Sequence, residues 1–177
     1  LAKSKNMISI RILQAIGPAY AQNWVSKFGF DANKHPPYLT MALGSGSVTP
    51  IQMVAAYSIF ANGGYRINPW LISKVTDQQG NVLTDVPKQR LDESVRVIDA
   101  RNAFIMNSML QEVTKTGTAA SAQVKLKRSD IYGKTGTTNE AMDAWFSGFH
   151  PTLAAVTWIG YDSPKKLGDR ESGGGLS

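Results

Sequence analysis

The sequence contains no cysteine among its 177 residues. This absence excludes a disulfide scaffold, a zinc site with thiolate ligands and a cysteine nucleophile. The chain also lacks any apolar run near the roughly 18 to 20 residues that cross a bilayer, and its first residues contain no signal-peptide hydrophobic region. The only histidines, His35 and His150, lie beside prolines and have no second ligand at metal spacing, so we expect them in surface loops. We therefore expect no metal, and any membrane anchor must lie outside these residues.

Charge is also sparse, since only 18% of the residues are charged, although the net charge is +6. The densest basic cluster holds three charges, Lys125, Lys127 and Arg128, and it lacks the interleaved aromatic residues of a nucleic-acid-binding surface. We therefore expect an anionic surface or substrate and no nucleic acid. With 42% hydrophobic residues, the composition and length are those of one globular domain.

Several segments have the spacing of helices. Met7, Ile10 and Leu13 share one helical face, and the Thr49-Pro50 pair is a typical N-cap followed by a proline in the first turn. Asp99 is a further N-cap. These patterns predict helices over residues 6–16, 19–28, 50–62, 100–113 and 118–124.

Other segments have the composition of strands. Residues 66–75 and 82–86 flank a polar turn at 77–80 and predict a β-hairpin. From residue 131 onward, aromatic and β-branched residues predict consecutive antiparallel strands over 131–138, 144–151 and 153–162. The glycines at 173–175 indicate a loop or a disordered end. The predicted fold class is α+β, an antiparallel β-sheet flanked by helices.

Some residues in these strands favour structural roles over chemical ones. Trp145 and Trp158, in adjacent predicted strands, are expected to pack on the sheet. Asp143 and Asp162 flank strands and are expected in turns rather than as a carboxylate pair. Tyr132 could line a cleft, but we attribute no chemistry to it.

The tetrapeptide Lys134-Thr135-Gly136-Thr137 lies in a predicted strand. Such a strand offers an ammonium charge, hydroxyls that hydrogen-bond a carboxylate, and a backbone N–H that is open to an oxyanion beside the glycine. The same four letters recur at residues 115–118, directly after a predicted helix, where Gly117 suits a helix C-cap. We therefore expect the copy at residues 115–118 to be a chance repeat, with Lys115 far from the site.

The segment Ser4-Lys5-Asn6 would by itself be interpreted as a helix cap. Together with Lys134-Thr135-Gly136, however, it matches the second and third motifs of the serine penicillin-binding proteins and β-lactamases. The stretches LAKSKNMISIRILQAIG, MALGSGSVTPIQMVAAYSIFANGG and YGKTGTTNEAMDAWFSGFHPTLAAVTWIGYD extend the resemblance over nearly the whole chain. The sequence thus resembles the transpeptidase domain of class A (bifunctional) penicillin-binding proteins.

This resemblance implies a β-lactamase/transpeptidase-like fold that is incomplete at both ends, with residues 1–177 forming part of one domain. The family's nucleophile is the serine of an S-x-x-K motif upstream of the Ser4 motif, and we expect it, like a terminal helix downstream, to lie outside this sequence. The only S-x-x-K here, Ser163-Pro164-Lys165-Lys166, contains a proline and is expected to be a loop.

The implied reaction is acyl transfer from the D-Ala-D-Ala end of a peptidoglycan stem peptide, through a serine acyl-enzyme, to an amine of a neighbouring stem; β-lactams mimic that peptide. Ser4 would relay a proton to the leaving nitrogen, Asn6 would bind the acyl amide, and Lys134 would supply positive potential. The implied catalytic residues are Ser4, Asn6, Lys134 and Thr137, and the implied substrate-binding residues are Thr135, Gly136, Thr137 and Thr138.

The resemblance further implies no cofactor and a position on the outer, periplasmic face of the bacterial cytoplasmic membrane. The expected partners are stem peptides, β-lactams and the upstream part of the same protein, which would complete an otherwise inactive chain. Two alternatives stay open: a non-catalytic relative that binds the cell wall or a partner through the same groove, and a basic adaptor without a site. An intact S-x-x-K upstream would favour catalysis over binding.

Overall fold

The computed structural model describes residues 1–168 and 171–176, and a three-stranded antiparallel sheet lies at its centre. The strands follow one another in the order β3-β4-β5, with bounds Tyr132–Thr137, Ala144–His150 and Leu153–Ile159. Lys134 pairs with Ser147 in β4, and Trp145 pairs with Trp158 in β5. The predicted consecutive strands and the α+β class are therefore confirmed.

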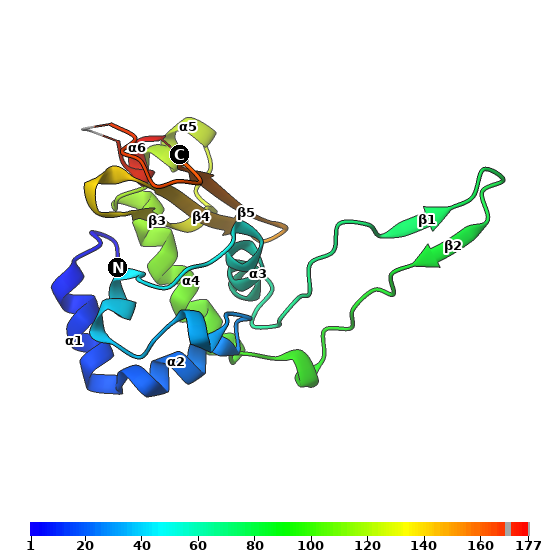
Figure 1. Cartoon of the computed structure of the whole chain (residues 1–177), viewed down its shortest axis with the longest axis horizontal. Helices are drawn as coiled ribbons and strands as arrows, with labels where there is room; N and C mark the ends of the chain where they lie inside the picture. The colour runs from blue at the N-terminus through cyan, green and yellow to red at the C-terminus, as the bar shows by residue number, and fades with distance from the viewer. Residues whose placement is uncertain (169–170, 177) are drawn as a thin grey trace.

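Helices cover both faces of this sheet (Figure 1). α4 packs on β3 and α3 packs on β4 and β5, whereas α6 packs on β3 and β4 from the side where α5 also lies. The α-helices are α1 (Asn6–Ile16), α2 (Pro18–Ser26), α3 (Pro50–Ala61), α4 (Ala100–Lys115), α5 (Ala120–Leu126) and α6 (Gly173–Leu176). Short 3₁₀ helices are η1 (Ala32–Lys34), η2 (Leu39–Leu43), η3 (Glu93–Val95) and η4 (Asn139–Ala141). No helix in the described ranges has the length and apolar character that crossing a membrane requires.

The predicted caps act as the sequence indicates. Thr49 and Gln52 form a reciprocal capping box at the start of α3, and the Asp99 carboxylate accepts from the Arg101 N–H at the start of α4. A hydrophobic core that includes Ile59 of α3 and Ala103 of α4 then joins these two helices. The local signals thus fix where both helices begin.

Three predictions about local structure were wrong. The glycines at 173–175 belong to the short helix α6, which packs on β3 and β4; Gly173 lies so close to the backbone of Gly136 and Trp145 that only a residue without a side chain fits there. Residues 66–73 are not a strand, since regular pairing begins only at Lys74. Gly117 is not the C-cap of α4: Thr116 takes that place, and Gly117 instead allows close approach to the Ala2 carbonyl.

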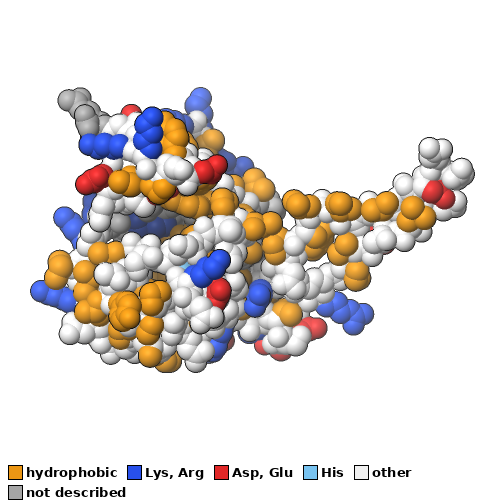
Figure 2. All heavy atoms as spheres, viewed as in Figure 1, with side chains coloured by type: hydrophobic (Ala, Val, Ile, Leu, Met, Phe, Trp, Pro, Cys, Tyr) orange, Lys and Arg blue, Asp and Glu red, His pale blue; other side chains and the backbone are white. Residues whose placement is uncertain are grey.

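The predicted hairpin is real and forms the tip of an arm that projects from the body (Figure 1). β1 (Lys74–Thr76) and β2 (Val82–Asp85) pair on either side of a turn in which the Asp77 carboxylate accepts from the N–H groups of Gln79 and Asn81. Both strands are exposed along their whole length. Hydrophobic side chains line much of the arm (Figure 2).

A buried hydroxyl ties α4 to the strand that carries the candidate site. Thr114 is fully buried, and its Oγ1 lies 2.6 Å from the Ile131 carbonyl oxygen, directly before β3. The Gln123 side-chain amide of α5 donates to Thr114 Oγ1 at 3.0 Å. Because buried polar groups without partners are costly, this junction holds β3 in a defined position between α4 and α5.

Candidate active site

Ser4 and Lys134, separated by 130 residues in the sequence, meet in the structure. The Lys134 ammonium donates to the Ser4 hydroxyl oxygen at 2.9 Å and to the Thr135 carbonyl at 2.8 Å. Partial burial lowers the pKa of Lys134 from its ordinary value of 10.5, because desolvation disfavours the charged form. The predicted contact between these two side chains is confirmed.

The backbone at Ser4 adopts an unusual conformation. Ser4 has a φ of 49°, in the left-handed region that a serine seldom occupies, and its N–H donates to the Leu1 carbonyl at 3.0 Å. Asn6 begins α1 two residues later. Residues with strained backbone are often found at functional sites. The conformation of Ser4 therefore agrees with a functional role for this segment.

Thr135 and Thr137 project from the same face of β3, as alternate residues of a strand do. Thr135 Oγ1 lies 2.6 Å from Thr118 Oγ1, and Thr137 Oγ1 accepts from the Gly173 N–H of α6 at 3.0 Å. Between them, Gly173 of α6 packs directly on the backbone of Gly136, where a side chain at position 173 would not fit. Two hydroxyls therefore line up along β3, each with one structural partner.

The other two predicted site residues lie at the margins of this group. The Asn6 side chain is exposed and makes no hydrogen bond with any described residue. The Thr138 hydroxyl accepts from the Asp143 N–H at 2.7 Å, so it closes the connection between β3 and β4. Of the seven predicted residues, Ser4 and Lys134 are joined by a direct hydrogen bond, and Thr135 and Thr137 are linked to Lys134 through strand β3.

Thr118 is a residue of the site region that the sequence interpretation passed over as part of the repeated tetrapeptide. The Thr118 N–H donates to the Ala2 carbonyl at 3.1 Å, and the Lys3 ammonium donates to the Thr116 carbonyl at 2.6 Å. Lys115 itself ends α4 and is exposed, but the expectation that the repeat lies far from the site was wrong for its other residues, because Thr116 and Thr118 contact the segment that carries Ser4. The signal that could have identified Thr118 is its place directly after a helix end, where a loop can reach a neighbouring strand.

One edge of β3 pairs with β4, and the opposite edge carries no strand in the described part of the chain. Such an edge presents backbone N–H and C=O groups that an extended peptide can pair with. The edge runs past the Lys134 ammonium and the hydroxyls of Thr135 and Thr137. The arrangement can therefore hold an extended peptide by its backbone and attract a negative charge near its end.

The aromatic and acidic residues beside this strand have structural partners. The rings of Trp145 and Trp158 lie 6.0 Å apart, and the Trp158 indole N–H donates to Asp143 at 2.8 Å. The two tryptophans pack on the sheet, as predicted. Asp143 lies in the connection before β4 and accepts the indole hydrogen bond, so all three residues have structural roles. The segment that starts at Ser163 is not helical, so the geometry that an S-x-x-K pair needs is absent there.

Comparisons with known proteins agree with this architecture. The family model described as penicillin binding protein transpeptidase domain matches residues 1–169. The chain is 46% identical over 178 residues to penicillin-binding protein 1A of Neisseria lactamica, covering 100% of this chain and 22% of that protein. It is 38% identical to penicillin-binding protein 1A of Pseudomonas aeruginosa, covering 98% of this chain and 27% of that protein.

Among solved structures, penicillin-binding protein 1A of Haemophilus influenzae superposes with a TM-score of 0.89 at 31% identity. That match covers 98% of this chain and 31% of the other. The chain therefore spans about a quarter of the length of these relatives. The matched region includes both the Ser4 segment and β3.

Proposed function

Since this chain belongs to the penicillin-binding protein transpeptidase domain family, we propose that it supplies one wall of the active site of a D,D-transpeptidase that cross-links peptidoglycan. The single observation that carries the proposal is the hydrogen bond between Lys134 and Ser4 beside the open edge of β3. The nucleophilic serine would come from a part of the protein outside this chain. β-Lactams would react with that serine as substitutes for the stem peptide.

Each residue of this wall has a defined part in the proposed acyl transfer. The peptide pairs with the edge of β3, and its terminal carboxylate accepts hydrogen bonds from the hydroxyls of Thr135 and Thr137. The serine oxygen attacks the carbonyl of the penultimate D-alanine, and the Thr137 N–H stabilises the negative charge that develops on that oxygen. The carbon–nitrogen bond then breaks, and terminal D-alanine leaves as an amine.

Ser4 carries the proton in that step. The leaving nitrogen takes the Ser4 hydroxyl proton, and Ser4 regains one from the base that deprotonated the nucleophile. The Lys134 ammonium donates to the Ser4 oxygen, so it stabilises the charge that forms there and leaves the Ser4 proton free to move. Asn6, at the start of α1, would bind the acyl amide of the substrate once the groove is occupied. An amine of a second stem finally accepts the acyl group from the serine.

The position of the protein in the cell is part of the same proposal. Stem peptides are exposed on the outer, periplasmic face of the bacterial cytoplasmic membrane, so we place this domain there. An anchor in another part of the protein would hold it. No step of the reaction needs a cofactor.

Release of D-alanine tests the function directly. The intact protein, incubated with a stem-peptide analogue that ends in D-Ala-D-Ala, should release D-alanine, and benzylpenicillin should stop the release. An analogue ending in L-Ala-L-Ala is the matched control and should release nothing. Binding of the analogue without D-alanine release would instead favour the non-catalytic relative, and absence of binding would favour the adaptor without a site.

A second prediction concerns Thr118. We expect Thr118→Val to lower kcat/KM for the D-Ala-D-Ala substrate by about 2- to 10-fold, since a neutral hydrogen bond contributes about 0.5 to 1.5 kcal/mol. The reason is that Thr118, by donating to Thr135 Oγ1, would leave the Thr135 proton free for the substrate carboxylate. The effect should be measured by D-alanine release in the intact protein.

Two controls separate this positioning role from general damage to the fold. Thr118→Ser keeps the hydroxyl and should stay within about twofold of the wild type. A substrate whose terminal carboxylate is converted to an amide should react equally with wild type and Thr118→Val, because it lacks the group that Thr135 holds. An equal loss for both substrates would mean that Thr118 acts elsewhere.

A further inference from the structure

A cavity of about 430 Å³ lies at the base of the arm, away from the residues of the proposed function. Arg66, Asn68 and Gln89 line it from the two sides of the arm, Lys27 lines it from the end of α2, and Arg96 lines it after η3. None of its lining residues belongs to β3 or to the Ser4 segment. Its volume is within the range of about 300 to 1,000 Å³ that is usual for small-molecule sites.

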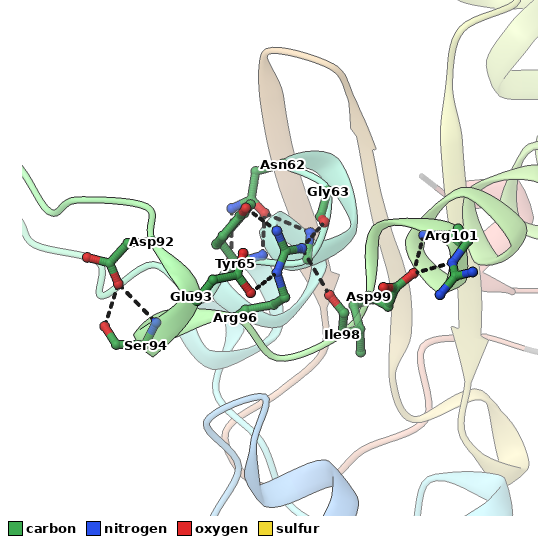
Figure 3. Close-up of polar contacts among 11 residues, drawn as sticks. Asn62, Gly63, Tyr65, Asp92, Glu93, Ser94, Arg96, Ile98, Asp99 and Arg101 are labelled. Carbon is green, nitrogen blue, oxygen red and sulfur yellow. Dashed lines mark hydrogen bonds and ion pairs between the residues drawn. The ribbon is translucent and has the colours of Figure 1, made fainter.

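The charged residues that line this cavity are all cationic: Lys27, Arg66 and Arg96. Arg96 is already neutralised, because its Nε donates to Glu93 at 2.7 Å (Figure 3). Its remaining N–H groups reach the Tyr65 hydroxyl and the carbonyls of Gly63 and Ile98. Arg96 therefore shapes the wall and is not available to a ligand.

The other two cations keep their charge uncompensated. Within residues 1–168 and 171–176, neither Lys27 nor Arg66 forms an ion pair with a carboxylate. The Lys27 ammonium lies 4.6 Å from the centre of the Trp24 ring. The Arg66 guanidinium lies against Gly29, two residues beyond Lys27, and both residues line the same cavity. Charges of one sign in a hollow concentrate their field and attract counter-ions.

The wall that carries Arg66 is held in place before any ligand arrives. The Gln89 side-chain amide donates to the Arg66 carbonyl at 2.8 Å and accepts from the Asn68 N–H at 2.9 Å. This clamp joins the two sides of the arm at its base. A site whose backbone is already ordered loses less entropy when it binds a ligand.

We propose that this cavity binds a small molecule that carries at least two oxyanion charges, such as a diphosphate or a polycarboxylate. The planar guanidinium of Arg66 matches two oxygens of one phosphate or carboxylate group, and Lys27 supplies a second positive charge for another group. Because Lys27 and Arg66 both lack a carboxylate partner among the described residues, the cavity favours a ligand with more than one negative charge. The net charge of +6 adds long-range attraction for such an anion.

Calorimetric titration of the intact protein with inorganic diphosphate, and separately with citrate, tests this site at low ionic strength. We expect at least one anion to bind with a Kd below 1 mM, roughly, and Arg66→Gln and Lys27→Gln each to weaken binding about 10-fold or more, as expected for loss of a charge-assisted hydrogen bond. Lys74→Gln, which removes the same charge from the exposed strand β1, is the matched control and should bind as the wild type does.

The outcomes decide the proposal whether or not the transpeptidase assignment holds, because D-alanine release is not the readout. Preference for diphosphate or for citrate identifies the oxyanion as phosphate or carboxylate. Arg66→Lys keeps the positive charge but loses the planar guanidinium that donates two parallel hydrogen bonds. Its affinity for the anion should therefore lie between those of the wild type and Arg66→Gln. No binding of either anion, or equal weakening by Lys74→Gln, would show that the cavity is not a site. Unchanged melting temperatures would confirm that the variants are folded.

Discussion

Replacing Lys134 by alanine in the intact protein is expected to slow acylation by benzylpenicillin about 100-fold or more. The lysine ammonium donates directly to Ser4, and removal of one donor that stabilises developing charge in an active site costs roughly 10²- to 10³-fold. The rate should be measured as covalent adduct formed against time, by intact mass. The slow acylation that remains would depend on Ser4 and on the hydroxyls of Thr135 and Thr137.

The repeated tetrapeptide provides the matched control for this experiment. Lys115→Ala removes a lysine from the same four-residue sequence, but its side chain is exposed at the end of α4, so acylation should stay within about twofold of wild type. If both variants lose activity equally, the assignment of the site to β3 is wrong. Near-equal melting temperatures would show that neither effect comes from unfolding.

The lowered pKa of Lys134 adds a pH dependence to the same measurement. A lysine whose pKa is lowered loses its proton at a lower pH than a free lysine does. The acylation rate should therefore fall on the alkaline side as Lys134 becomes neutral, at a pH below 10.5. The Lys134→Ala variant should lack this alkaline fall, whereas Lys115→Ala should keep it.

The 177-residue chain alone should form no covalent adduct with penicillin, whereas a longer chain extended upstream through the S-x-x-K segment should form one. Acylation requires an activated serine, and the groups described here can only orient a carboxylate, polarise a carbonyl and move a proton. Half an oxyanion hole is also a severe loss, since one donor contributes about 2.7 to 4 kcal/mol. Incubation with a labelled penicillin followed by intact-mass measurement compares the two chains.

The short chain should also be poorly soluble, because apolar side chains stand exposed on its helices. Met7 and Ile12 of α1 are 60% and 57% exposed, and Phe104 of α4 is 73% exposed. Hydrophobic side chains gather over the part of the surface where α1 lies (Figure 2). Exposed apolar patches of this kind are usual for surfaces that another segment covers.

Two results would contradict the prediction that only the longer chain forms an adduct with penicillin. An adduct on the short chain, mapped to Ser4 or Ser163, would show that the nucleophile lies within these residues. Absence of an adduct on the folded longer chain would favour a non-catalytic relative that binds the cell wall or a partner. Far-ultraviolet circular dichroism of both chains is needed to show that each is folded.

The sequence alone predicted the elements whose signals are local. The Thr49-Pro50 cap, the Asp99 cap and the strand composition from residue 131 onward located α3, α4 and the sheet, because capping and side-chain alternation depend on neighbours within a few residues. The motifs at Ser4 and Lys134 also predicted their contact, although only as a consequence of shared chemistry. The family resemblance rested on the same residues.

Only the tertiary structure decided features that depend on distant partners. The glycines at 173–175 have poor helix propensity, yet they form α6, which packs on β3 and β4, and Gly173 fits there because it has no side chain to clash with the backbones of Gly136 and Trp145. Thr118 becomes part of the site region because β3 brings Thr135 to it, which no pattern within residues 115–118 encodes. Likewise, Lys27, Arg66 and Arg96 surround one cavity although they are scattered in the sequence, because packing rather than propensity sets which charges become neighbours.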